Sequence, residues 1–269
     1  VNLVGTLMPA SITVDAKKNF VLSGSGSLSG TMPLNKTNTG TFTINTTNTF
    51  TGATTVSNGT VLVHGALNSS PVTVRTSGTI GGNGRLGNGT TVQSGGRTAP
   101  GNGIGSPGTL TITNSLTLAN NVTHRFDISD DPTGTIKTND LIQVFGTLSV
   151  TGTNYIRVNL LDGPLADGVY PLFKYTTLAG GLANFVLINA NGVLTNPPGM
   201  IAIHVDNIRT PATVQWRGDG VNNIWDEGVT ANWRNAGTPD VFYFFDSPVF
   251  DDSGSNSPAI NLVGPITPQ

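Results

Sequence analysis

The side chains with the greatest potential for chemistry in this sequence are its fifteen carboxylates, all but one of them aspartate. Nine of them gather at residues 127–131, 219–227 and 246–252. Paired carboxylates can cleave glycosidic bonds when they lie about 5 to 10 Å apart in a groove. Most of these acids stand beside Gly, Ser or Pro, at positions typical of exposed turns. The sequence therefore favours a non-catalytic protein and leaves a carbohydrate-active enzyme as an alternative.

Calcium binding is the second chemistry that these acids suggest. Oxygen ligands on flexible loops suit hard cations, although neither candidate loop matches the EF-hand pattern. The predicted calcium ligands are Asp219, Asp226, Asp251 and Asp252. The alternative is that each carboxylate accepts hydrogen bonds from the backbone of its own turn. The sequence suggests no other cofactor.

The overall charge excludes some classes of partner. Only 10% of the residues are charged, and 13 Lys and Arg against 15 Asp and Glu give a net charge of −2. Nucleic-acid binding is not expected, because neutralising phosphates requires clustered basic residues. No apolar stretch approaches the length of a membrane-spanning helix. The chain has no cysteine, so packing and backbone hydrogen bonds must stabilise it without disulfides.

The elements that would position these acids are β-strands. Residues 41–44 and 109–113 alternate threonine with apolar residues, which predicts strands with one buried and one solvated face. Phe42 and Ile112 are predicted to point inward, and Thr43 and Thr111 outward. With 35 glycines and many Asn-Gly pairs, the strands are short and end in turns. Such repetition favours a solenoid of about 20 to 29 residues per coil over an antiparallel sandwich.

Composition changes along the chain and predicts two domains. Residues 1–209 carry the Thr- and Gly-rich strands and form the predicted solenoid. Residues 212–269 contain all three tryptophans, Trp216, Trp225 and Trp233, and an aromatic run at 242–245. Aromatic residues at this density predict a small β module with its own core, linking one copy to the next.

One sequence is present twice, 259 residues apart. Residues 1–5 read Val-Asn-Leu-Val-Gly and residues 260–264 read Ile-Asn-Leu-Val-Gly. This duplication indicates one unit of a head-to-tail array, either covalent or assembled by exchange of strands. The predicted assembly residues are Val1, Asn2, Leu3, Val4, Gly5, Ile260, Asn261, Leu262, Val263 and Gly264.

Residues 20–30, 40–44 and 49–63 also carry a family resemblance. They contain a strand rich in Leu, Ser and Gly, the corner Phe50-Thr51-Gly52, a Thr-x-Val strand, and the strand Gly-Thr-Val-Leu-Val. This order resembles the autotransporter-associated β-strand repeat, and weaker similarity extends over most of the chain. The resemblance implies a right-handed parallel β-helix exported to the surface of a Gram-negative-type bacterium. It brings no catalytic residues.

These observations predict an all-β fold: a right-handed parallel β-helix followed by a small Trp-rich β module. The predicted function is a non-enzymatic, extracellular structural protein, a rigid unit that binds further copies of itself to build a fibre or stalk. One alternative is an adhesin that binds surface carbohydrate by stacking sugars on its three tryptophans. The other is the carbohydrate-active β-helix enzyme.

Overall fold

The computed structural model describes residues 1–206, 210–254 and 259–264. Within these residues there are 33 β-strands and one short 3-10 helix, η1 (Leu182–Asn184), so the predicted all-β class is confirmed. None of the helices described is long and apolar enough to cross a membrane. The chain forms two compact units, Val1–Ile188 with Gly192–Asp206 and Asn189–Asn191 with Asn207–Gln269.

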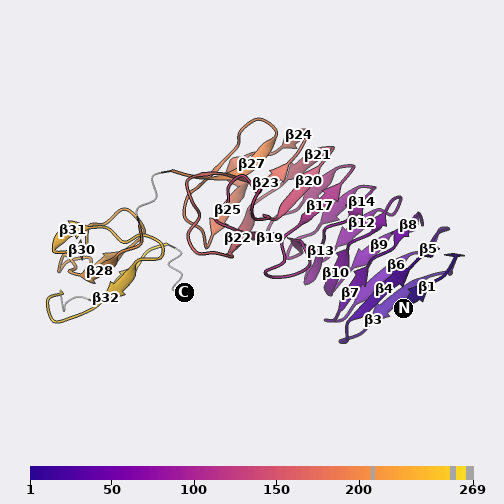
Figure 1. Cartoon of the computed structure of the whole chain (residues 1–269), viewed down its shortest axis with the longest axis horizontal. Helices are drawn as coiled ribbons and strands as arrows, with labels where there is room; N and C mark the ends of the chain where they lie inside the picture. The colour runs from indigo at the N-terminus through magenta and orange to yellow at the C-terminus, as the bar shows by residue number, and fades with distance from the viewer. Residues whose placement is uncertain (207–209, 255–258, 265–269) are drawn as a thin grey trace. The chain divides into compact units, whose positions relative to one another are not determined.

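The first unit is a parallel β-helix, in which successive coils add strands to three sheets (Figure 1). Every third strand of the chain belongs to the first sheet, and its nine strands are all parallel. The strands of this sheet are β1 (Asn2–Leu3), β4 (Phe20–Gly24), β7 (Thr41–Ile44), β10 (Gly59–Val63), β13 (Gly78–Gly82), β16 (Arg97–Pro100), β19 (Thr123–Ile128), β22 (Asn154–Leu160) and β25 (Phe185–Ile188).

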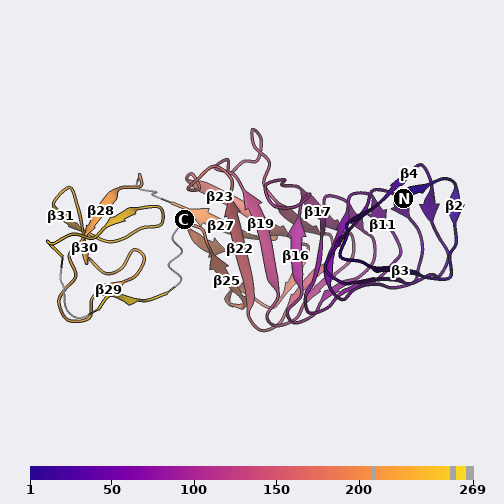
Figure 2. The same cartoon turned by 90° about the horizontal axis from the view of Figure 1, so that it is seen from below.

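The other two faces of the coils are built in the same way, and Figure 2 shows the first coils around β2, β3 and β4. The parallel strands of the second face are β2 (Thr6–Leu7), β5 (Ser27–Leu28), β8 (Thr47–Asn48), β11 (Ala66–Leu67), β14 (Arg85–Leu86), β17 (Thr109–Ile112), β20 (Leu141–Val144) and β23 (Gly168–Lys174). Those of the third sheet are β3 (Ile12–Asp15), β6 (Leu34–Thr37), β9 (Thr54–Val56), β12 (Val72–Val74), β15 (Thr90–Val92), β18 (Leu116–Leu118), β21 (Thr147–Val150) and β24 (Thr177–Ala179).

Coil length varies more widely than the sequence predicted. Ile80 pairs with Thr98, 18 residues later, whereas Thr123 pairs with Tyr155, 32 residues later. The longer coils carry loops at residues 101–108 and 129–140, outside the strands. The strand ladders continue across these insertions, because an added loop can bulge outward without changing which residues stack.

The predicted alternation of buried and solvated residues is confirmed. In the third sheet Val56, Val74, Val92 and Leu118 stack inward and are fully buried. The positions between them form an outward ladder, which consists of Thr13, Asn35, Thr55, Thr73, Thr91, Thr117 and Ser149. Threonine suits this ladder because its branched side chain favours strands while its hydroxyl stays solvated.

The second sheet ends differently from the sequence prediction, which placed residues 1–209 in parallel coils. Beyond β23 the chain reverses, and β27 (Met200–Val205) and β26 (Val193–Thr195) pair antiparallel. Gly192 and Gly199, with φ of +101° and +77°, lie at the starts of these two strands. A hairpin at this point pairs the edge that β23 would otherwise leave open.

The second unit contains the aromatic core expected from its tryptophans. Its four-stranded sheet consists of β31 (Thr238–Asp240), β30 (Trp233–Asn235), β28 (Thr213–Trp216) and β32 (Ser247–Val249). Trp216, Trp233, Val214 and Phe242 form the buried cluster, and Trp225 packs against it. A separate pair of strands, β29 (Ile224–Trp225) and β33 (Asn261–Leu262), is parallel.

Inward and outward positions should differ sharply in their tolerance of charge. Ile112 and Phe42 are 1% and 4% exposed, whereas the side chains of Thr111 and Thr43 are partly exposed. Ile112→Asp should cost several kcal/mol, because it buries an unpaired carboxylate, and Thr111→Asp about 1 kcal/mol or less. Thermal melting measures both, with Phe42→Asp and Thr43→Asp as a second pair. Equal losses in each pair would contradict the assigned faces.

Candidate functional site

One concave surface of the first unit lies on the outward face of its first sheet. It is a hollow of about 450 Å³, floored by the threonine ladder Thr41, Thr60 and Thr79. The loop at residues 101–108 forms one side, and Arg125, Asp127 and Asp140 also line it. This loop belongs to one of the longer coils, between β16 and β17. Shorter coils pass directly from one strand to the next and have no such loop. We refer to this hollow as the outer groove.

Asp140 connects two parts of the outer groove. One carboxylate oxygen, Oδ1, accepts a hydrogen bond from the Gly108 N–H at 2.7 Å. The other, Oδ2, accepts from the Asp127 N–H at 2.8 Å. The side chain therefore joins the end of the 101–108 loop to strand β19.

Asp127 holds the same loop from the other side. Its Oδ2 accepts hydrogen bonds from the Gly105 N–H at 2.6 Å and the Ser106 N–H at 3.2 Å. Its Oδ1 accepts from the Asn159 side-chain amide at 2.7 Å. Both oxygens thus have partners that belong to the protein, and a carboxylate with this arrangement orders a loop.

Both acids are buried. Asp140 is 2% exposed and Asp127 5%. Burial raises the pKa of Asp140 to about 8, and the neighbouring charge of Asp127 adds to the effect, although two backbone N–H groups oppose it. A raised pKa beside a second carboxylate is one attribute of a general acid. Each oxygen of the two acids already accepts a hydrogen bond from the protein, and these bonds hold the loop.

His64 contacts Asn102, a residue of the loop that lines the outer groove. Its Nδ1 lies 2.6 Å from Asn83 Oδ1, and its Nε2 lies 2.9 Å from Asn102 Oδ1. These residues come from successive coils, 19 residues apart each time. Both ring nitrogens are engaged, so the imidazole bridges coils and has no free nitrogen for a substrate.

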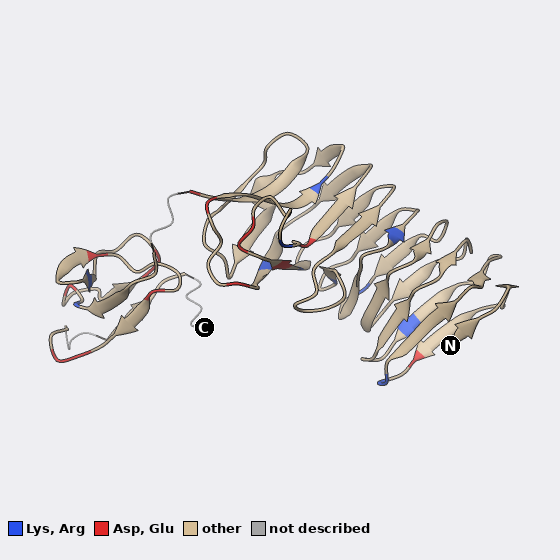
Figure 3. Ribbon diagram, viewed as in Figure 1, with Lys and Arg blue, Asp and Glu red and all other residues tan. Residues whose placement is uncertain are grey.

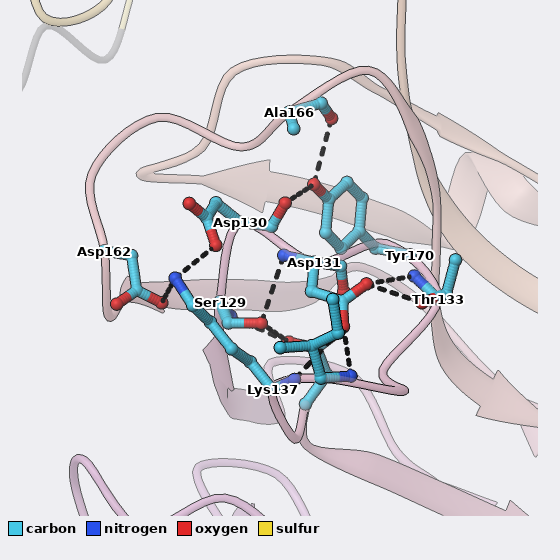
Figure 4. A network of polar contacts seen from close by, with 10 residues as sticks. Ser129, Asp130, Asp131, Thr133, Lys137, Asp162, Ala166 and Tyr170 are labelled. Carbon is cyan, nitrogen blue, oxygen red and sulfur yellow. Dashed lines mark hydrogen bonds and ion pairs between the residues drawn. The ribbon is translucent and has the colours of Figure 1, made fainter.

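The remaining acids of the first cluster belong to a separate network, shown in Figure 4. Lys137 Nζ contacts Asp130 at 2.7 Å and Asp162 at 3.3 Å. Asp131 accepts hydrogen bonds from Thr133, Ile136 and Lys137, and these lower its pKa. Acidic residues of the first unit gather mostly in loops beyond β19 (Figure 3).

Tyr170 anchors this network to the body of the first unit. Its hydroxyl donates toward the carbonyls of Ala166 and Asp130, at 2.9 Å and 3.2 Å (Figure 4). Burial raises its pKa to about 12, so it remains a donor at neutral pH. The network orders the loop at residues 129–140 and presents no pair of carboxylates to a common groove.

The predicted calcium ligands lie in turns whose donors already bind them. Asp219 Oδ1 accepts from the N–H groups of Val221, Asn222 and Asn223 at 2.8 to 2.9 Å, which lowers the pKa of the carboxyl. Asp226 accepts from the Thr230 N–H and hydroxyl at 2.8 and 2.6 Å. These contacts match the turn alternative, in which the carboxylate replaces water at backbone donors.

The second predicted pair behaves similarly. Asp251 accepts from the N–H and hydroxyl of Ser253 at 2.9 and 2.6 Å and from the Gln215 amide, and its pKa is lowered. Asp252 is exposed. In the described part of the chain no three His, Asp or Glu side chains gather to hold a metal. The four predicted ligands are therefore not brought together there as one site.

The tryptophans are placed as core residues and not as sugar-stacking platforms. Trp216 and Trp233 are 2% and 1% exposed, and their rings meet edge to face at 4.9 Å. Trp225 meets Trp233 at 5.1 Å and is partly buried. Stacking on a sugar needs an exposed ring face, so the predicted binding mode on these rings is not supported.

Sequence reasoning missed Lys36, which is fully buried at an inward position between Val14 and Val56. Its Nζ donates to the carbonyls of Thr37, Asn38 and Asn58 at 2.7, 2.6 and 3.2 Å. Burial lowers the pKa of this lysine. The signal in the sequence was a lysine at an inward position of a strand. Its three acceptors come from two different coils, so they could not be identified from the segment around the lysine alone.

No model of a known protein family matches this chain, and no curated protein is significantly similar to it.

The raised pKa of Asp140 predicts a pH-dependent contribution to stability. Above about pH 4 the unfolded chain releases this proton, while the folded protein retains it to about pH 8. The stabilisation that Asp140 contributes is fully present below about pH 4 and is lost as the pH rises to about 8. The stability difference between wild type and Asp140→Asn should therefore fall by roughly 1.4 kcal/mol per pH unit between about pH 4 and 8.

Denaturant unfolding across this pH range measures the difference. Taking the difference between two proteins removes the opposing contribution of His124, whose pKa burial lowers to about 3. Asp162→Asn, at an exposed carboxylate outside the groove, is the matched control and should show no such slope. A flat difference for Asp140→Asn would contradict the assignment of a raised pKa.

Proposed function

We propose that this chain is a non-enzymatic structural unit of a fibre or stalk, displayed extracellularly by a Gram-negative-type bacterium. The observation that carries the proposal is the continuous ladder of parallel strands in the first unit, nine strands long in the first sheet. Such a ladder resists bending and stretching because each coil is hydrogen-bonded to the next along three faces. A rigid spacer is the simplest use of this architecture.

The hydrogen bonds that the carboxylates already accept support a non-enzymatic role. The two acids of the outer groove accept hydrogen bonds from backbone and amide donors, and Asp131, in a loop beyond β19, accepts them from its own turn. A catalytic carboxylate must keep an oxygen available for a proton or a substrate. The extracellular location rests on the resemblance of residues 20–63 to the autotransporter-associated repeat.

Electron microscopy of material sheared from the surface of producing cells tests this function. We expect filaments with an axial repeat equal to one copy of the chain, labelled along their length by antibodies against the first unit. Isolated particles, or filaments that the antibodies do not label, would contradict the structural role. Immunolabelling of intact cells provides the control for location.

Carbohydrate binding is the second candidate, and the outer groove is the observation that favours it. Its hydroxyl ladder, Asn102 and the exposed Arg125 offer donors and acceptors that suit a glycan. Arg125→Ala should then weaken glycan binding about 5- to 10-fold, the effect of losing one or two hydrogen bonds. Arg157 pairs with Arg125 on the next strand but does not line the groove, so Arg157→Ala is the matched control.

Isothermal titration against the glycans selected by an array measures both variants. Equal affinities for wild type and Arg125→Ala, or equal losses in the two variants, would exclude the groove as the binding site.

A further inference from the structure

Three of the eight arginines in the sequence gather on the outward face of the first sheet. Arg97 lies in β16, Arg125 in β19 and Arg157 in β22, and these strands are neighbours in the sheet. Arg125 pairs directly with Arg157, so their backbones lie about 4.8 Å apart. Arg97 is one strand and two residues away from Arg125. We refer to these three residues as the arginine strip.

The guanidinium groups of the arginine strip have no partners among the described residues. None of the three donates a hydrogen bond or forms an ion pair there, and Arg125 and Arg157 are exposed. By contrast, Arg85 donates to the Asn68 side chain, and Lys137 is paired with two aspartates. Like charges directly opposite each other in a sheet are destabilising, so the facing pair Arg125 and Arg157 favours an anion that binds both.

The residues beside the arginine strip suit a sugar. One outward row across the first sheet consists of Thr41, Thr60, Thr79, Arg97, Thr123 and Tyr155. The hydroxyls of this row can donate and accept hydrogen bonds, and the partly exposed ring of Tyr155 offers an apolar surface with a polar end. The next row consists of Leu62, Gly81, Ala99, Arg125 and Arg157. Its small residues leave space between the hydroxyls and the arginines.

Two aspartates near the arginine strip limit the charge of a ligand that it would bind. Asp127 lies two residues beyond Arg125 in β19, and Asp140 lines the outer groove with it. Burial raises the pKa of Asp140 to about 8, so this side chain is largely uncharged at neutral pH. Three guanidinium groups and the Asp127 carboxylate leave an excess of two positive charges. This excess matches a ligand with one or two carboxylates.

We propose that the arginine strip binds an acidic saccharide, an oligosaccharide of uronic acids. One carboxylate of the ligand accepts hydrogen bonds from Arg125 and Arg157 together, and the sugar rings lie along the hydroxyl row toward the outer groove. The planar guanidinium group matches a carboxylate and binds it through two parallel hydrogen bonds. This inference rests on carbohydrate binding, the second candidate function, and specifies the class of glycan. The structural role as a rigid unit does not depend on it.

Isothermal titration of the full chain with oligogalacturonate tests the charge of the ligand. Methyl-esterified oligogalacturonate is the matched ligand, because it keeps the sugar backbone and lacks the carboxylate charges. We expect the ester to bind at least about 10-fold more weakly, since hydrogen bonds between charged groups are the strongest in such a site. Added salt should weaken binding of the acid and leave that of the ester unchanged. Equal affinities for the acid and the ester would overturn the proposal.

Arg125→Gln and Arg157→Gln test the residues, and each should weaken oligogalacturonate binding about 10-fold. Arg157, the control for a neutral glycan confined to the outer groove, is thus decisive for an acidic one. Arg75→Gln is the matched control, because Arg75 is exposed after β12 in the third sheet and its loss changes the net charge equally. We expect a change of less than about 2-fold for this remote charge. Equal losses in Arg75→Gln and Arg157→Gln would overturn the assigned site.

Thermal melting of the same variants separates binding from folding. Removing one of two facing like charges should leave the Tm unchanged or raise it. Saturating oligogalacturonate should raise the Tm of the wild type by more than that of Arg157→Gln, because a ligand stabilises the folded state according to its affinity. A lower Tm for Arg157→Gln without ligand would overturn the argument that this arginine lacks a partner in the protein.

The outcomes separate the ligand class from the functions proposed above. Equal binding of acid and ester, weakened by Arg125→Gln and not by Arg157→Gln, would leave glycan binding in the outer groove standing and overturn the arginine strip. Inorganic polyphosphate that binds as tightly as oligogalacturonate would show attraction to any polyanion and overturn the saccharide assignment. Absence of binding to every one of these probes would overturn the acidic saccharide and leave the fibre unaffected. Losses at both arginines with oligogalacturonate alone would support the proposal, whether or not the native material forms filaments.

Discussion

The backbone hydrogen bonds between successive coils are the interaction on which the rest of the first unit depends. They place each residue directly over its equivalent one coil earlier, so an inward position stays inward through the whole sheet. Val56, Val74, Val92 and Leu118 form a continuous buried row for this reason. Insertions such as residues 101–108 are tolerated where they leave that stacking unchanged, and this loop forms one side of the outer groove.

Most of the polar chemistry of the described chain serves this architecture. Asp127 and Asp140 hold the 101–108 loop, His64 bridges three coils, and Lys36 binds carbonyls at a corner. Buried polar groups are costly unless they are hydrogen-bonded, and here the partners are largely backbone groups of neighbouring coils. With so few charged residues, each ionised group acts locally on one turn or loop.

The last coils of the β-helix show how a stack of parallel strands can terminate. At one end β26 and β27 turn the second sheet antiparallel and so pair an open edge within the chain. This pairing matters because an uncovered edge of a sheet is a template for further strands.

The sequence by itself determined the strand class, the faces of the strands and the aromatic core of the second unit. These features follow from a period of two and from composition, which are local properties, and Phe42, Ile112 and Trp233 are buried as expected. The partners of Asp140, Asp127 and Lys36 and the antiparallel end were decided only by the tertiary structure. They depend on the lengths of individual coils and thus on which residues stack, and neither quantity can be read from a segment considered alone.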